Sequence, residues 1–148
     1  NQSMPDSLPE RYEMGTMNIS GMAGLNASLQ WIKETTTEAI RAKEDENRQK
    51  LLQLLEKYGF ITVVGNALGR DYVGIVSCLI DSISSDSAGR ILEERGIAVR
   101  TGLQCAPLAH QFLGTYPAGT IRFSVNYFTS ENDFVELKAA LDDIEENI

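Results

Sequence analysis

A cysteine in a loop-forming segment is the first residue of this chain that could do chemistry. Cys105 is preceded by Gly102 and Gln104 and followed by Pro107, residue types that favour a loop over a packed core. Arg100 is close in sequence, and a nearby cation lowers the pKa of a thiol and raises its thiolate fraction. The segment is therefore a candidate reactive thiol. The alternative is that Cys105 is a small buried hydrophobe, as most free cysteines are.

An arginine in the middle of a predicted strand could bind an anion. Residues 119–127 alternate between apolar and polar side chains, and the apolar face carries Ile121, Phe123 and Val125. Arg122 falls on the opposite face. Its planar guanidinium suits bidentate binding of a carboxylate. The alternative is an arginine that only faces solvent.

The only histidine and the second cysteine offer less chemistry. His110 follows Cys105 by five residues, but a catalytic Cys–His pair needs contact in space, which spacing does not establish. We expect His110 to be hydrogen-bonded within its own loop. Cys78 lies in the apolar stretch GIVSCLI, so we expect it to pack in a core. One histidine and two distant cysteines do not have the spacing of a zinc site, so no metal is predicted.

A glycine–threonine pair precedes the first predicted helix. Gly15 and Thr16 could present backbone amides and a hydroxyl to a phosphate at the start of a helix beginning near Ile19. Such pairs are common before helices, so the residues alone indicate this site only weakly.

Hydrophobic periodicity predicts the elements that must position these residues. Helices are expected over residues 19–34, 37–58, 85–96, 106–113 and 130–148, and strands over 60–64, 74–80, 97–100 and 119–127. Turn-forming residues between the first two strands indicate a hairpin. The order predicts an α+β fold, with a small, mostly antiparallel sheet of about four strands packed with helices and a long N-terminal helix.

Size and charge narrow the class of protein. A chain of 148 residues forms one domain and hardly two. The net charge of −8 argues against nucleic acid as a partner, and no apolar run is long enough to predict a membrane span. Two cysteines make no disulfide framework, so we expect a cytoplasmic protein. The N-terminus is polar and unpatterned, which we interpret as part of a longer polypeptide.

Three stretches together resemble the C-terminal part of the cysteine desulfurase family, within the class V aminotransferases that use pyridoxal phosphate. They are RYEMGTMNISGMAGLNASLQWI, VRTGLQCAPLAH and GTIRFSVNYFTSENDFVELKAAL. They resemble, in order, the opening of the helix that links the large and small domains, the loop of the catalytic cysteine, and the closing strand and helix. The resemblance implies that residues 1–36 end the large domain and that residues 37–148 form the small one.

The resemblance also implies roles for individual residues. Cys105 would take sulfur from L-cysteine, leaving an enzyme persulfide and L-alanine. Arg122 would hold the substrate carboxylate, and Arg100 would support the cysteine loop. Gly15 and Thr16 would contact the phosphate of pyridoxal 5'-phosphate, typically the cofactor of the partner subunit in a homodimer. A sulfur-acceptor protein is a further implied partner.

Two departures from the family pattern matter. The lysine that forms an imine with the cofactor belongs to an upstream domain, and the lysines of this chain fall in amphipathic helices. We therefore expect the fragment neither to hold the cofactor covalently nor to be active by itself. Gln104 stands where many relatives have a histidine, so the acid–base partner of the thiol is open.

Two other hypotheses stay open at this point. One is a class V enzyme that acts on another amino acid without a catalytic cysteine. The other is a free-standing α+β module that binds an amino acid.

Overall fold

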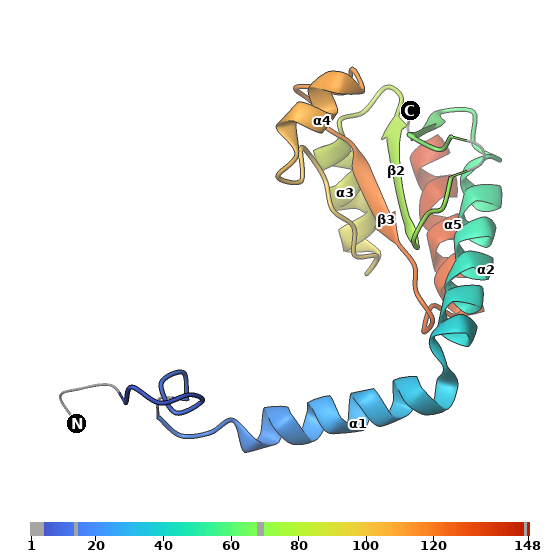
Figure 1. Ribbon diagram of the computed structural model, residues 1–148. Coiled ribbons are helices and arrows are strands. Elements are labelled where there is room, and N and C mark those ends of the chain that lie inside the picture. The colour runs from blue at the N-terminus through green and yellow to red at the C-terminus, as the bar shows by residue number, and fades with distance from the viewer. Residues whose placement is uncertain (1–4, 14, 68–69, 147) are drawn as a thin grey trace. The chain divides into compact units, whose positions relative to one another are not determined.

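The computed structural model describes residues 5–13, 15–67, 70–146 and 148. The chain separates into two compact units, Asn1–Ala39 and Ile40–Ile148, which are described one at a time. Figure 1 shows the elements of both units along the chain.

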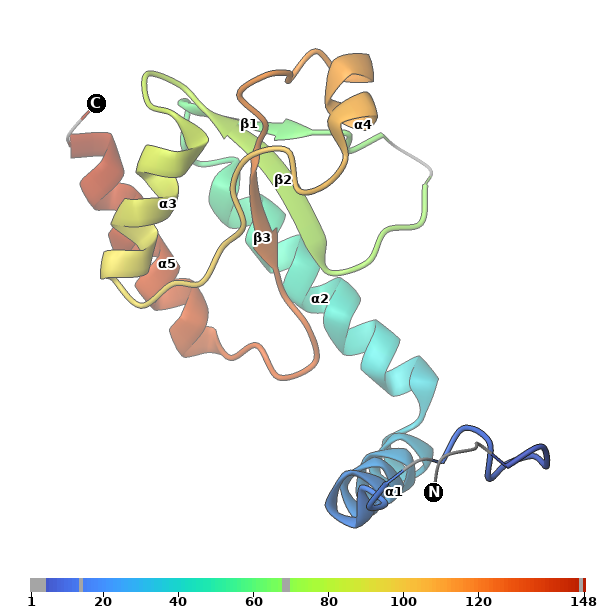
Figure 2. The ribbon, with the colours of Figure 1, turned by 90° about the vertical axis from the view of Figure 1, so that its left-hand side faces the viewer.

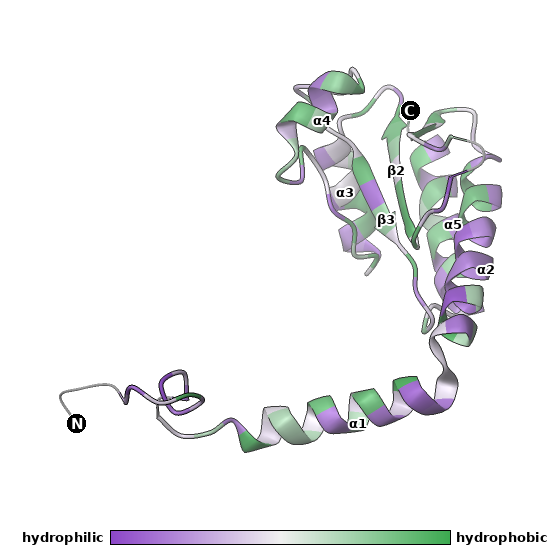
Figure 3. Cartoon of the chain, in the orientation of Figure 1, coloured by the Kyte–Doolittle hydropathy of each residue, from purple (hydrophilic) through white to green (hydrophobic). Residues whose placement is uncertain are grey.

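The first unit contains one long helix, as predicted. Helix α1 spans Ile19–Thr35, and the side chain of Asn18 caps it by accepting the Gly21 N–H at 2.9 Å. Helix α1 has no buried residue. Its hydrophobic residues therefore lie at the surface, among polar ones (Figure 3). They include Met22, Leu25, Leu29 and Ile32, which recur at helical spacing.

The second unit is an α+β fold, which confirms the predicted class. Its elements are α2 (Thr37–Leu55, beginning in the first unit), β1 (Ile61–Val64), β2 (Ile75–Ile80), α3 (Ser85–Glu94), α4 (Pro107–Phe112), β3 (Ile121–Ser124) and α5 (Glu131–Glu146). Within the described residues, the strands form one antiparallel sheet in the order β1-β2-β3. None of the described helices is long and apolar enough to cross a lipid bilayer.

One face of the sheet carries the core. The register pairs Cys78 with Val63 on one side and with Ile121 on the other, so apolar side chains align across the three strands. Helices α2, α3 and α5 lie against this face (Figures 1 and 2). They contribute buried side chains that include Leu51, Leu55, Leu92, Leu141 and Ile144. Removing this apolar surface from water stabilises the unit.

The segment expected to form a fourth strand pairs at a single position. Arg100 forms an isolated antiparallel bridge with Arg122, while Ile97 and Val99 pack their side chains against the core. Gly102 follows with a φ of +79°, and its carbonyl still accepts the Thr120 N–H at 3.1 Å, but no regular ladder continues beyond the single bridge. The segment therefore lies beside β3 and the residue before it, but it does not form a fourth strand.

Candidate functional site

Cys105 lies exposed on the loop between Arg100 and α4. This position matches the predicted loop and rules out the alternative of a buried hydrophobe. Gln104 and Cys105 have φ angles of +50° and +64°, in the left-handed region that side chains rarely adopt. Such a conformation costs about 1–3 kcal/mol per residue and is found most often at functional sites. The surrounding contacts must therefore hold the loop in place.

The cysteine loop is hydrogen-bonded to strand β3 and to the residue before it, through backbone groups and one side chain. Arg100 and Arg122 exchange two main-chain hydrogen bonds, of 3.1 and 2.7 Å. The Thr120 N–H donates to the Gly102 carbonyl at 3.1 Å. The Nε2 group of Gln104 donates to the carbonyls of Arg100, at 3.3 Å, and Thr120, at 3.2 Å. Hydrogen bonds therefore join the loop of Cys105, the candidate nucleophile, to the strand of Arg122, the candidate carboxylate-binding residue.

The backbone of Gly119, just before β3, lies close to that of Gly102 in the cysteine loop. A Cβ atom on Gly119 would lie 2.2 Å from the Gly102 carbonyl carbon and 2.3 Å from its oxygen. Gly119 also has a φ of +74°. Only glycine meets both conditions, because a side chain would clash and would be strained.

The side chain of Arg122 is available to bind an anion. Ile121 and Phe123, its neighbours on β3, are 0% and 4% exposed on the core face, and Arg122 is half-buried on the other face. Its register partner across the sheet is Ser77. The Nε atom is buried without a hydrogen-bond partner, and no ion pair within the described part of the chain includes Arg122. A carboxylate could supply the missing acceptor.

The exposed side chain of Arg100 makes no hydrogen bond or ion pair among the described residues. The support that Arg100 gives to the cysteine loop comes instead from its backbone, which pairs with Arg122.

The other candidate side chains are structural, as predicted. His110 lies buried on α4, and its Nδ1 atom lies 2.7 Å from the hydroxyl of Thr115 just after the helix, so the ring is hydrogen-bonded within its local segment, which is helical where a loop was expected. Cys78 is 0% exposed, and burial raises the pKa of its thiol to about 12. Cys105 is thus the one cysteine of the two that solvent can reach.

Gly15 and Thr16 lie exposed in the first unit, just before α1. They border a shallow cleft of about 230 Å³ together with Glu13, Asn18 and Met22. The cleft places a hydroxyl and a glycine backbone at the start of a helix, which fits a phosphate group.

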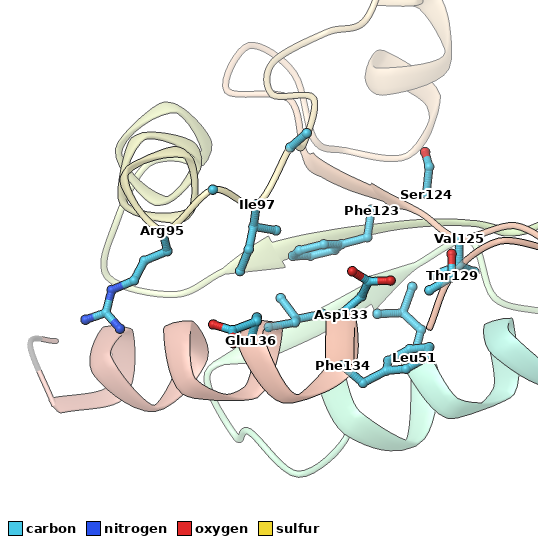
Figure 4. A pocket seen from close by; sticks show the side chains of 13 residues that line it. Leu51, Arg95, Ile97, Phe123, Ser124, Val125, Thr129, Asp133, Phe134 and Glu136 are labelled. Carbon is cyan, nitrogen blue, oxygen red and sulfur yellow. The ribbon is translucent and has the colours of Figure 1, made fainter. Parts of the chain in front are cut away.

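A separate cleft of about 260 Å³ lies between the end of α3, strand β3 and α5 (Figure 4). Ile97 and Phe123 give it apolar walls, and the carboxylates of Asp133 and Glu136 project beside them. None of the site residues predicted from the sequence lines this cleft, so it is distinct from the expected site.

The sequence interpretation missed the structural roles of Gln104 and Gly119. The sequence gives no sign of the two carbonyl groups that accept hydrogen bonds from Gln104, because Arg100 and Thr120 are brought to it only by the fold. Gly119 does carry a signal, since it falls within the predicted strand 119–127 and a glycine inside a strand pattern often marks a close backbone approach.

Comparisons with known proteins identify the family. The family described as aminotransferase class-V matches residues 1–137. The chain is 34% identical to a probable cysteine desulfurase of Aeropyrum pernix, covering 92% of this chain and 34% of that protein. It is 32% identical to a cysteine desulfurase of Synechococcus elongatus, covering 90% and 21%.

A solved structure shows a similar fold. The apo cysteine desulfurase of Thermococcus onnurineus superposes with a TM-score of 0.80 at 25% identity, over 95% of this chain and 34% of that one. The chain therefore spans about a third or less of the length of these relatives. Because the family match extends over most of the sequence, the chain belongs to the class-V aminotransferase family.

Proposed function

We propose that this chain is the C-terminal part of a pyridoxal-phosphate-dependent cysteine desulfurase. The observation that carries the proposal is the exposed Cys105 on a strained loop joined to the strand of Arg122. The similarity to cysteine desulfurases supports the same reaction. The unpaired cysteines agree with a reducing compartment, and we place the protein in the cytoplasm.

Cys105 acts as the nucleophile in this proposal. Its thiolate attacks the sulfur of bound L-cysteine, so that an S–S bond forms while the Cβ–S bond of the substrate breaks. The carbon keeps the electron pair and takes up a proton, which gives L-alanine and a persulfide on Cys105. A sulfur-acceptor protein then removes the outer sulfur. The exposure of Cys105 supports access by such a partner.

Arg122 orients the substrate. Its guanidinium binds the α-carboxylate of L-cysteine and provides the acceptor that Nε lacks. Because β3 and the cysteine loop share hydrogen bonds, binding at Arg122 fixes the substrate relative to Cys105. The two residues thereby bring the sulfur atoms into the proximity that the reaction needs.

The cofactor contact falls on the first unit. Gly15 and Thr16 would contact the phosphate of pyridoxal 5'-phosphate, and the cleft beside them supports this role. When bound, the cofactor supplies the electron sink for breaking the carbon–sulfur bond. We assign residues 1–36 to the end of the large domain and 37–148 to the small domain of a homodimer. The imine-forming lysine lies upstream, so the fragment alone is inactive.

The test is Cys105→Ala in the full-length polypeptide that carries this chain. We expect sulfide release from L-cysteine to fall at least a hundredfold, as for loss of other covalent nucleophiles, while the visible absorbance of the cofactor is kept. Cys78→Ala is the control and should retain the turnover of the folded protein. Unchanged sulfide release by Cys105→Ala would refute the proposal in favour of a class V enzyme without a catalytic cysteine.

A further inference from the structure

We propose that Gln104 is a positioning residue, whose side-chain amide holds the Cys105 loop in register with the strand of Arg122. This inference rests on the proposed function, because it assigns Gln104 to the placement of the nucleophile. Gln104 is the residue directly before Cys105 and is half-buried. Hydrogen bonds made by its side chain therefore restrain the backbone on which the thiol of Cys105 is carried.

The hydrogen bonds of the amide support this role. Nε2 is within hydrogen-bond distance of two carbonyl oxygens, that of Arg100 at 3.3 Å and that of Thr120 at 3.2 Å. An amide nitrogen has two N–H groups, so it can donate to both carbonyls. Arg100 lies before the loop and Thr120 begins the approach to β3. A single side chain thus closes the loop against the strand.

The carbonyl of Arg100 is shared with the other candidate site residue. It accepts the Arg122 main-chain N–H at 2.7 Å as well as the Gln104 amide. Loss of the amide would leave Arg122 paired with Arg100 but would release the peptide of Cys105. Cys105 would then move, while Arg122, which binds the substrate carboxylate, stays in place. A shift of this kind lowers the rate of the chemical step more than it lowers substrate affinity.

The chemistry of the amide explains why glutamine suits this position. A carboxylate of the same shape would place negative oxygens against two carbonyl oxygens and has no proton to donate at neutral pH. A methionine of similar length has no donor at all. Because an amide does not titrate, Gln104 fixes the loop without exchanging protons with the thiol.

The experiment compares Gln104→Met and Gln104→Glu with Gln111→Met in the full-length polypeptide. Gln111 is an exposed glutamine on α4 and serves as the matched control. We expect Gln104→Met to lower kcat for sulfide release about 10- to 100-fold and to change the KM for L-cysteine less than about threefold. Gln111→Met should change neither constant. For Gln104→Glu, the ratio of its activity to that of wild type should rise as pH is lowered from 7 to 5. The reason is that the protonated carboxyl group has one O–H donor, whereas the carboxylate has none.

Alkylation of Cys105 by iodoacetamide provides a readout that needs no turnover. Cys78 is buried and serves as the unreactive internal reference. We expect the Cys105 alkylation rate to change severalfold in Gln104→Met at an unaltered melting temperature. Unchanged kcat and alkylation, or a raised KM with unchanged kcat, would overturn the inference. If Cys105→Ala is inactive while Gln104→Met is fully active, this inference fails and the proposed function stands.

Discussion

The thiol of Cys78 lies 3.8 Å from the carbonyl oxygen of Ile121, its register partner on β3. Both residues are 0% exposed, so the thiol is sealed between the central strands and the helices. Burial disfavours the thiolate and raises the pKa of Cys78 to about 12, from about 9 in an unfolded chain. This makes Cys78 a pH-dependent contributor to stability.

Stability should fall in alkali because of Cys78. A group whose pKa is raised on folding contributes its stability below the unfolded pKa and loses it as pH rises, here between about 9 and 12. The loss should reach about 2 kcal/mol at pH 10.5. Urea unfolding at pH 8 and pH 10.5 measures it. Between these two pH values, the free energy of unfolding of Cys78→Ala should fall by about 2 kcal/mol less than that of wild type. An equal fall in both proteins would show that Cys78 does not cause the loss.

Substitution of Arg122 should weaken substrate binding. Arg122→Lys keeps the charge but loses the planar fork, and Arg122→Met loses both. A hydrogen bond to a charged group contributes about 1.5–3 kcal/mol, so the KM for L-cysteine should rise about 10- to 100-fold in Arg122→Met and less in Arg122→Lys. Steady-state kinetics of the full-length protein measure this. Arg90→Met, an exposed site on α3, is the control. An unaltered KM in Arg122→Met would remove Arg122 from the substrate site.

Gly119 should tolerate alanine far less than Gly114 does. Both have positive φ, +74° and +71°, but a Cβ on Gly114 would meet nothing within 4 Å. Gly114→Ala should therefore cost about 1–2 kcal/mol for the backbone strain alone. Gly119→Ala adds a clash with the backbone of Gly102, of about 1–3 kcal/mol or more. Urea denaturation of both variants tests the difference. Equal losses would show that the approach to Gly102 is not tight.

The second unit should fold without α1. Helix α1 has no buried residue, so the piece 36–148 should melt cooperatively within a few degrees of the whole chain. The piece 50–148 is the control, because it lacks Asn47, whose buried amide donates to the carbonyls of Asn126, at 2.8 Å, and Thr129, at 3.2 Å. Thermal unfolding followed by circular dichroism compares them. A non-cooperative transition in 36–148 would show that the core requires the first unit.

The local elements of the fold were predictable from periodicity. Met22, Leu25, Leu29 and Ile32 recur at helical spacing within the helix predicted over 19–34, and the alternation about Arg122 predicted which face of β3 would be buried. Ser130 and Asp133 have the spacing of a capping box at the start of α5, and the Ser130 N–H donates to the Asp133 carboxylate at 2.7 Å. These features depend on residues close in sequence, which is why the pattern contains them.

Contacts between distant segments were not predictable in the same way. The strand expected at residues 97–100 forms one bridge, because pairing depends on the register between segments that are distant in sequence. Arg48 is a charged residue of α2, yet it is 6% exposed and its guanidinium lies 4.4 Å from the centre of the Tyr72 ring. The exposure of Cys105 followed from its neighbours, whereas its link to Thr120 through Gln104 required the structure.

The left-handed backbone at Gln104 has a consequence for protein engineering. Glycine adopts such a φ without steric cost, so Gln104→Gly would relieve the backbone strain at position 104. The same substitution would remove the amide that donates to the carbonyls of Arg100 and Thr120. Strain relief and loss of the loop hydrogen bonds therefore oppose each other at this one position.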